Sequence, residues 1–285
     1  MTITVGVLAL QGAFHEHLKL LHAAADRLAA QNTQQWRFIE VRTEAQLETC
    51  DALIIPGGES TAISLVAARS NLLEPLRGFV KIHRKSTWGT CAGLILLAES
   101  ANRTKQGGQE LIGGLDVRVN RNHFGRQTES FQADLELPFL TCQDNGEPSQ
   151  PFRGVFIRAP VVEKILRFSD SLQVEEQQKQ GTVVAPSRQP ENIAALEAMS
   201  DHVDVLAKLA GRVARLEDNG IHVATDPEAG DIVAVKQGNV FGTSFHPELT
   251  DDPRIHMWWL QQVKSAIQKA EGAGGAQKEN NLAYR

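Results

Sequence analysis

Cysteine is scarce in this chain of 285 residues: Cys50, Cys91 and Cys142 are an odd number and lack metal-ligand spacing. A disulfide framework and a zinc site are therefore both disfavoured, and a reducing compartment fits. Blocks of like charge are absent, and the formal net charge is -5. Composition thus gives no electrostatic reason to expect nucleic acid or anionic lipid as the main partner, and we expect a small ligand or a protein instead.

Long apolar runs and targeting signals are missing as well. No apolar stretch reaches the roughly 18 residues that span a bilayer, and no basic segment precedes the apolar run Ile3–Leu8. We therefore expect a cytoplasmic chain, complete from Met1, that does not enter a membrane. With 42% hydrophobic residues, the chain can bury a core as one large domain or as two small ones.

Short β-branched or apolar runs alternate with helical patterns through the first third of the chain, which is typical of βαβ units and a mostly parallel sheet. Predicted strands are Ile3–Leu8, Trp36–Val41, Ala52–Ile55 and Ser86–Trp88, and predicted helices are Phe14–Ala30, Thr61–Arg69, Leu72–Arg84 and Ala92–Glu99. Later, β-like runs at Leu115–Val119, Phe131–Leu135 and Gly154–Ile157, with a turn-rich stretch at Gln143–Pro151, indicate added antiparallel strands and a surface loop. Two last strands, Asp231–Val235 and Val240–Ser244, lead to a closing helix at Arg254–Gln268.

One domain is expected over residues 1–270, with an insertion at about 170–225 and a flexible tail at 271–285. Apolar residues of the insertion recur at alternating spacings of three and four, which predicts one stripe of a helix. These residues are Leu196, Met199, Val203, Leu206, Ala210 and Val213. A helix packed on its own domain and a docking or oligomerisation helix are both compatible with the stripe, and disorder of the segment is the third alternative.

Gly89-Thr90-Cys91-Ala92-Gly93 follows a predicted strand and opens a predicted helix, as a nucleophile elbow does, with cysteine in place of serine. Glycine is tolerated best beside so sharp a turn, because side chains there would clash. The positive end of the helix dipole also favours a reactive thiolate. Taken alone the motif is weak, since a buried, inert cysteine beside glycines is the commoner outcome.

Phe245-His246-Pro247-Glu248 supplies a base and a carboxylate to orient it. In an extended segment residues i and i+2 point the same way, so the carboxylate of Glu248 can reach an imidazole nitrogen of His246. That arrangement is the base and third member of a catalytic triad. A surface histidine near a chance carboxylate remains the alternative for this motif in isolation.

Ile55-Pro56-Gly57-Gly58-Glu59-Ser60 is a strand end, two glycines and a helix start. Glycines there let backbone N–H groups approach a ligand and act as oxyanion donors. Ser60 can instead be only an N-cap, with Pro56-Gly57 only a turn. A phosphate cradle is disfavoured, because a Walker lysine and a G-x-G-x-x-G pattern are both absent.

The ordered combination of PGGES, G-x-C-x-G and a C-terminal H-P-E resembles the class I (triad) glutamine amidotransferases. Longer matches narrow the resemblance to the glutaminase subunits of pyridoxal 5'-phosphate synthase. These matches are Gly6–Gly12, Gly89–Ala98, Arg121–Gln127, Gly154–Pro160 and Ser244–Thr250. The resemblance covers about Thr2–Pro160 and Asp231–Lys264, and it implies a three-layer α/β fold of flavodoxin-like topology, with helices on both faces of a mostly parallel sheet and added antiparallel strands.

The resemblance also implies roles for individual residues. Cys91 would attack the side-chain amide of L-glutamine, His246 would transfer the proton, and Glu248 would orient His246. Substrate contacts would come from Gly57, Gly58, Glu59, Arg121, Ile157 and Arg158, oxyanion donors from Gly58 and Ala92, and the partner interface from Gln11. The implied partner is the lyase (synthase) subunit, and the reaction needs neither a metal nor an organic cofactor.

Departures from the family and rival functions leave several points open. Asn120 stands where many relatives have glutamate, and the stretches 160–233 and Gln143–Pro151 are expanded. Another class I glutaminase, such as the one serving imidazole glycerol phosphate synthesis, is the nearest rival. A hydrolase or peptidase with the same elbow and a catalytically inactive binding module are rivals of other classes.

Overall fold

Five parallel strands form the centre of the computed structural model, which describes residues 1–29, 33–102, 109–121, 130–143, 150–166, 181–209 and 232–283. They are β1 (Thr2–Leu8), β2 (Gln35–Val41), β3 (Ala52–Ile55), β4 (Ser86–Thr90) and β13 (Val240–Thr243). Their order, β2-β1-β3-β4-β13, is the 2-1-3-4-5 order of flavodoxin-like sheets. Strands β3, β4 and β13 are buried at every residue, as expected for parallel strands covered on both faces.

The sheet continues beyond β13 through mostly antiparallel pairs. The added strands are β12 (Ile232–Gln237), β9 (Val161–Ile165), β6 (Leu115–Asn120), β5 (Ala98–Asn102) and β10 (Thr182–Val184), in that order, with β11 (Asp204–Lys208) pairing to β12. A separate two-stranded sheet joins β7 (Ser130–Leu135) to β8 (Phe152–Ile157). The predicted parallel core with added antiparallel strands is confirmed.

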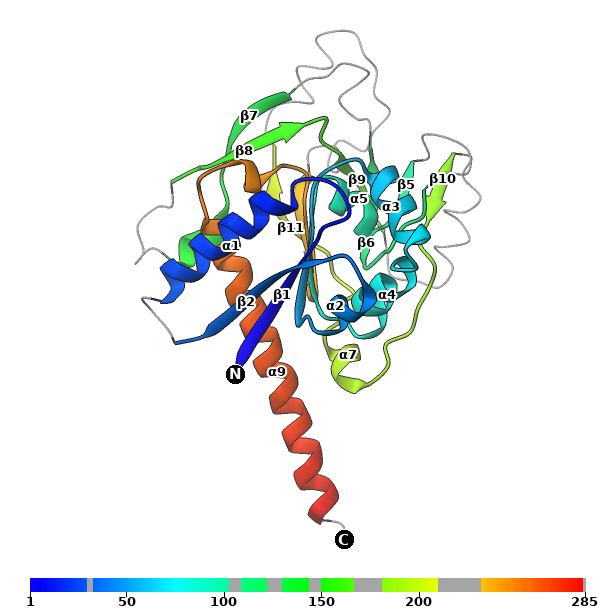
Figure 1. Ribbon diagram of the computed structural model, residues 1–285, viewed down its shortest axis with the longest axis vertical. Helices are drawn as coiled ribbons and strands as arrows, with labels where there is room; N and C mark the ends of the chain where they lie inside the picture. The colour runs from blue at the N-terminus through cyan, green and yellow to red at the C-terminus, as the bar shows by residue number, and fades with distance from the viewer. Residues whose placement is uncertain are drawn as a thin grey trace.

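Helices cover both faces of the sheet, so the fold has three layers (Figure 1). On one face, α1 (Phe14–Ala29) lies against α9 (Arg254–Ala283), and Leu21 and Trp259 pack with Val5 and Ile54. The other face carries α2 (Glu44–Glu48), α3 (Ser60–Arg69), α4 (Leu73–Arg77) and α5 (Ala92–Leu97), where apolar side chains pack with Leu53. Because side chains alternate along a strand, Leu53 and Ile54 enter different cores.

Two predicted helices end earlier than expected. The helix predicted to reach Glu99 ends at Leu97, because β5 pairs with β6 and the Glu99 carboxylate is held there by Lys81 (Nζ to Oε1, 2.7 Å) and by the backbone N–H of Gly114 (2.8 Å). The helix predicted over Leu72–Arg84 is α4 followed by a π-helical turn at Gly78–Ile82.

The predicted insertion helix is wrong where the structure describes it. A short helix, α7, spans Ile193–Glu197, and strand β11 spans Asp204–Lys208. Ser200 separates them: its hydroxyl donates to the His202 carbonyl at 2.9 Å and accepts from the His202 N–H at 3.1 Å. Such a local turn competes with helix. The outer part of the stripe, Ala210 and Val213, lies outside the described residues, as does most of the predicted loop Gln143–Pro151.

The closing helix is longer than predicted: α9 runs to Ala283 and so continues through most of the segment expected to be a tail (Figure 1). The structure also has short 3-10 helices at Pro138–Gln143 and Pro247–Leu249. Among the residues given above, no helix is both long enough and apolar enough to cross a membrane. The division into one domain, insertion and flexible tail stays a prediction.

Candidate active site

Cys91 lies at a sharp turn between β4 and α5. Its backbone has φ 47° and ψ -97°, a strained conformation for a residue with a side chain. A Cβ atom at Gly89 would lie 2.4 Å from the Gly93 carbonyl carbon, and one at Gly93 would lie 2.0 Å from the Ile55 carbonyl oxygen. The glycines are therefore required by close backbone packing, and the turn has the geometry of a nucleophile elbow.

His246 and Glu248 follow β13, the strand that pairs in parallel with β4. The Cys91 N–H donates to the Thr243 carbonyl at 2.8 Å, so this pairing brings the end of β13 beside the elbow. The His246 N–H donates to the Val155 carbonyl at 2.8 Å, which ties the histidine to β8 as well. Nδ1 of His246 lies 2.7 Å from Oε1 of Glu248, and both side chains are buried.

Electrostatics favours a charged His246. Burial lowers its pKa, but interactions with the Cys91 side chain and with Glu248 outweigh burial and raise the pKa to about 10. Nε2, the nitrogen on the side of the ring away from Glu248, is buried without a hydrogen-bond partner among the described residues. The Cys91 and Glu248 side chains thus both favour the protonated form of His246, as a thiol–imidazole pair requires.

The Gly57-Gly58 turn after β3 packs directly on this pair. A Cβ atom at Gly57 would lie 2.3 Å from Cε1 and 2.7 Å from Nδ1 of the His246 ring. At Gly58 it would lie 2.4 Å from Oε1 of Gln11, which also accepts the Glu59 N–H at 2.8 Å. Gln11 is exposed, and its side chain therefore braces the turn from outside.

Glu59, rather than Ser60, caps helix α3. Its carboxylate accepts the N–H groups of Thr61 (3.0 Å) and Ala62 (2.6 Å). Partial burial raises the pKa of Glu59, while these hydrogen bonds lower it to a net value below the ordinary one. Arg121 lies over the same helix end, donating through Nη2 to the hydroxyls of Ser60 (2.9 Å) and Thr61 (3.1 Å). Arg121 and Glu59 also interact electrostatically, although burial lowers the pKa of Arg121.

Of the remaining predicted residues, the structure places Ile157 and Ala92 next to the nucleophile. Sγ of Cys91 lies 4.0 Å from the Ile157 carbonyl oxygen, and Ala92 is the first residue of α5. Arg158 is exposed and has a positive φ of 45°. The described contacts thus join His246 to Glu248 and Gly57, and Cys91 to Ile157, while the pairing of β4 with β13 brings the two groups together. Arg121 contacts Ser60 and Thr61, next to Glu59.

Two buried histidines behind Glu248 were not predicted. His17 of α1 and His256 of α9 are fully buried, and their ring nitrogens lie 3.0 Å apart (Nδ1 to Nε2). Burial lowers the pKa of His17 well below its usual range and that of His256 to about 3. His17 shares a buried stripe with Leu20, Leu21, Ala24 and Leu28. A histidine within an apolar helical stripe is the sequence signal that would have found it.

A neutral buried His256 predicts sensitivity to acid. Because the unfolded state binds a proton near pH 6.5 and the folded state only near pH 3, stability is full above pH 6.5 and falls as pH drops towards 3. The expected slope is up to about 1.4 kcal/mol per pH unit from this group. Urea unfolding of wild type and His256→Phe at pH 7, 6 and 5 measures it. Equal losses of unfolding free energy with falling pH in the two proteins would contradict the assignment of a neutral His256.

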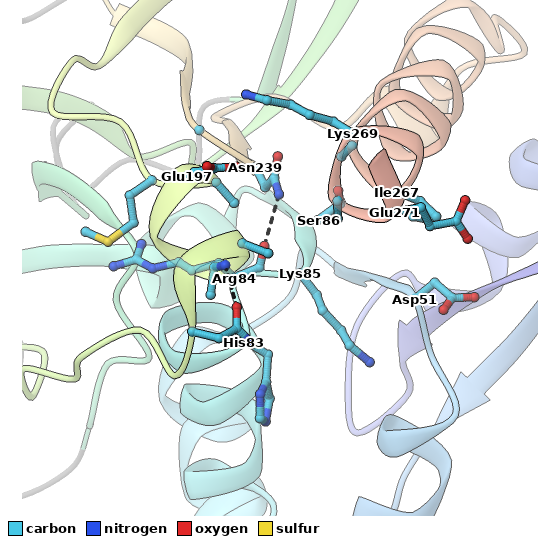
Figure 2. A pocket seen from close by; sticks show the side chains of 18 of the residues that line it. Asp51, His83, Arg84, Lys85, Ser86, Glu197, Asn239, Ile267, Lys269 and Glu271 are labelled. Carbon is cyan, nitrogen blue, oxygen red and sulfur yellow. Dashed lines mark hydrogen bonds between the residues drawn. The ribbon is translucent and has the colours of Figure 1, made fainter. Parts of the chain in front are cut away.

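A cavity of ≈ 600 Å³ lies at the other end of β4 and β13, where Ser86 begins β4 and Asn239 precedes β13 (Figure 2). Lys85, Lys236 and Lys269 are among the residues that line it, and it shares none of the predicted site residues. In open α/β sheets ligands bind at the carboxyl ends of the parallel strands, where Cys91 lies, and not at this end. Within the described ranges no group of three or more His, Cys, Asp or Glu side chains is arranged to hold a metal ion.

A cysteine on a strained elbow beside a buried histidine–glutamate pair, at the carboxyl edge of a parallel sheet, is the arrangement of a triad-type thiol enzyme on an α/β fold. The chain belongs to the SNO glutamine amidotransferase family, whose model matches residues 7–205 and 197–265. This confirms the predicted resemblance to glutamine amidotransferases.

Curated relatives and a solved structure agree with this family. The chain is 42% identical over 271 residues to the probable pyridoxal 5'-phosphate synthase subunit PDX2 of Arabidopsis thaliana, covering 95% of this chain and 90% of that one. It is 37% identical to the pyridoxal 5'-phosphate synthase subunit PdxT of Streptomyces avermitilis, covering 93% and 96%. A crystal structure of a glutamine amidotransferase superimposes with a TM-score of 0.58 at 34% identity, covering 91% and 98%.

Proposed function

We propose that the chain is a glutamine amidohydrolase that converts L-glutamine to L-glutamate and ammonia and supplies the ammonia to the synthase (lyase) subunit of pyridoxal 5'-phosphate synthase. The observation that carries the proposal is the buried His246–Glu248 pair, with its 2.7 Å contact, interacting with the elbow cysteine Cys91. The family and the pyridoxal 5'-phosphate synthase relatives supply the substrate and the pathway. The protein is proposed to act in the cytoplasm.

The cycle has two halves. The Cys91 sulfur bonds to the carboxamide carbon of glutamine, and His246 passes a proton to the amide nitrogen. The C–N bond then breaks, ammonia departs, and a γ-glutamyl thioester remains on Cys91. Water then adds to the thioester carbon while His246 takes its proton, and the carbon–sulfur bond breaks to give glutamate and free Cys91. Glu248 holds the ring and stabilises its cationic form in both halves.

The other site residues hold the substrate and its developing charge. The N–H groups of Gly58 and Ala92 are the proposed oxyanion donors, each of which is worth roughly 3 kcal/mol when preorganised. Arg121 is the proposed partner of the α-carboxylate, since a guanidinium can bind it with two hydrogen bonds. Gly57, Glu59, Ile157 and Arg158 complete the proposed glutamine contacts.

The synthase subunit is proposed to dock near Gln11, whose side chain braces the Gly58–Glu59 turn. A subunit bound at Gln11 contacts the side chain that supports the turn carrying the proposed oxyanion donor Gly58. Binding of the partner can therefore control glutaminase activity. We therefore expect the purified chain to release little glutamate by itself and much more with the synthase subunit.

Glutamate release from glutamine, measured with and without that subunit, tests the proposal. Stimulation by imidazole glycerol phosphate synthase instead would assign the chain to the rival pathway. High activity of the isolated chain would contradict the coupling, and absence of glutamate release under every condition would favour an inactive binding module.

A further inference from the structure

The Glu248 carboxylate has two oxygens, and the Cys91–His246–Glu248 triad accounts for only one of them. Oε1 bonds to Nδ1 of His246, whereas Oε2 is buried and has no hydrogen bond of normal length among the described residues. An unsatisfied oxygen on a buried carboxylate is costly. Nε2 of His17 lies 3.5 Å from this oxygen.

His17 is placed for this contact by three elements. It projects from α1, and Nε2 also lies 3.2 Å from the hydroxyl of Thr90, the residue before the nucleophile. The ring meets Trp88 of β4 edge-on, with centroids 5.4 Å apart. Nδ1, on the other side of the ring, lies 3.0 Å from Nε2 of His256 on α9.

The hydrogen bonds fix the tautomer of each ring. If Nδ1 of His17 carried the proton, the lone pair of Nε2 would face the carboxylate, and His256 would have to bury its own proton on Nδ1. That nitrogen has no partner among the described residues, and a buried N–H without an acceptor is rarer than a buried acceptor without a donor. The consistent arrangement has His256 donating from Nε2 to Nδ1 of His17, which leaves the His17 proton on Nε2, towards Glu248 and Thr90.

We propose that His17 is a positioning residue that donates from Nε2 to the second oxygen of Glu248, with His256 fixing its tautomer. At 3.5 Å the two atoms are about 0.3 Å beyond normal hydrogen-bond length, so a small shift of either side chain forms the bond. Both rings are neutral, so they orient the carboxylate without competing with His246 for its charge. The inference rests on the proposed glutaminase function and adds two members to the chain of groups behind Cys91.

Two substitutions at position 17 separate this role from packing. The amide nitrogen of Gln is as many bonds from Cα as Nε2 of histidine, whereas the amide nitrogen of Asn corresponds to Nδ1. His17→Gln therefore keeps a donor towards Glu248, and His17→Asn removes it while keeping a polar group towards His256. Both lose the ring, so a structural role would affect them alike.

The experiment measures glutamate release by the chain together with its synthase subunit, and unfolding by urea. We expect kcat to fall about tenfold or more in His17→Asn, with KM little changed, and to stay within about threefold of wild type in His17→Gln. His22→Gln, an exposed histidine of the same helix, is the matched control and should be unchanged. Equal losses in the two position-17 variants, or a loss confined to KM, would overturn the proposal.

A second variant covers the case in which His17→Asn does not fold. His256→Phe keeps an aromatic ring against Trp88 but removes the proton that fixes the His17 tautomer. We expect kcat to fall about threefold to tenfold in this variant, and wild-type kcat in a folded His256→Phe protein would contradict the tautomer assignment. Cys91→Ala in the same assay keeps the two questions apart, because full activity there would refute the glutaminase function itself, whatever the histidine variants do.

Discussion

Replacing Cys91 with alanine is expected to lower kcat for glutamate release by about a thousandfold or more, because no other group of the site can form the thioester. The fold should survive, since alanine keeps the same Cβ atom and therefore adds no strain at a φ of 47°. The measurement is glutamate release in the presence of the synthase subunit, together with the urea midpoint of the variant.

Cys50 provides the matched control. It is fully buried, its Sγ lies 3.3 Å from the Gln46 carbonyl oxygen, and burial raises the pKa of its thiol to about 11. Cys50→Ala should keep wild-type kcat at some cost in stability, and a glutamine-analogue diazoketone should label Cys91 but not Cys50. Retention of activity in Cys91→Ala, or labelling only at Cys50, would refute the assignment of the nucleophile.

Adding one methyl group at Gly57 is expected to reduce kcat about a hundredfold, the scale of effect seen when a catalytic group moves by about 1 Å. The new Cβ would lie 2.3 Å from Cε1 of His246, so either the ring or the Gly57-Gly58 turn must shift. The catalytic base or an oxyanion donor is displaced in either case. Activity of Gly57→Ala with the synthase subunit measures the effect.

Gly78→Ala is the control for the added methyl group, because its Cβ would meet no atom closer than 3.9 Å. Its backbone φ is -56°, so alanine fits there without strain. We expect unchanged activity and equal or slightly higher stability, since alanine restricts the unfolded chain. If Gly57→Ala proved as active as Gly78→Ala, the close packing of the turn on His246 would have no catalytic role.

The parallel half of the fold could be predicted from sequence because its signals are local. Strand β3 was predicted with its observed bounds, Ala52–Ile55, since a short buried run ends at Pro56. The stripe from Leu196 to Val213 misled because its described part is divided among the short helix α7, the turn at Ser200 and strand β11, and spacings of three and four recur across them by chance. In β11 the pairing with β12, a tertiary contact, overrides the local pattern.

Site residues, too, could be predicted only where the signal is local in the sequence. Cys91, His246 and Glu248 could be found because each belongs to a short motif whose chemistry is readable from neighbouring residues. The capping role of Glu59 was missed because Ser60 is the more common cap, and only the N–H groups of Thr61 and Ala62 reveal it. His17 could not be paired with Glu248, because residues so distant in the chain meet only through the packing of α1.

The expanded stretch of chain lies between β9 and β12, and its strands β10 and β11 add to the antiparallel half of the sheet. Cys91, Gly57 and His246, by contrast, follow the neighbouring strands β4, β3 and β13. Segments of very different length can therefore lie between β9 and β12 without changing the position of the Cys91 thiol relative to the His246 ring.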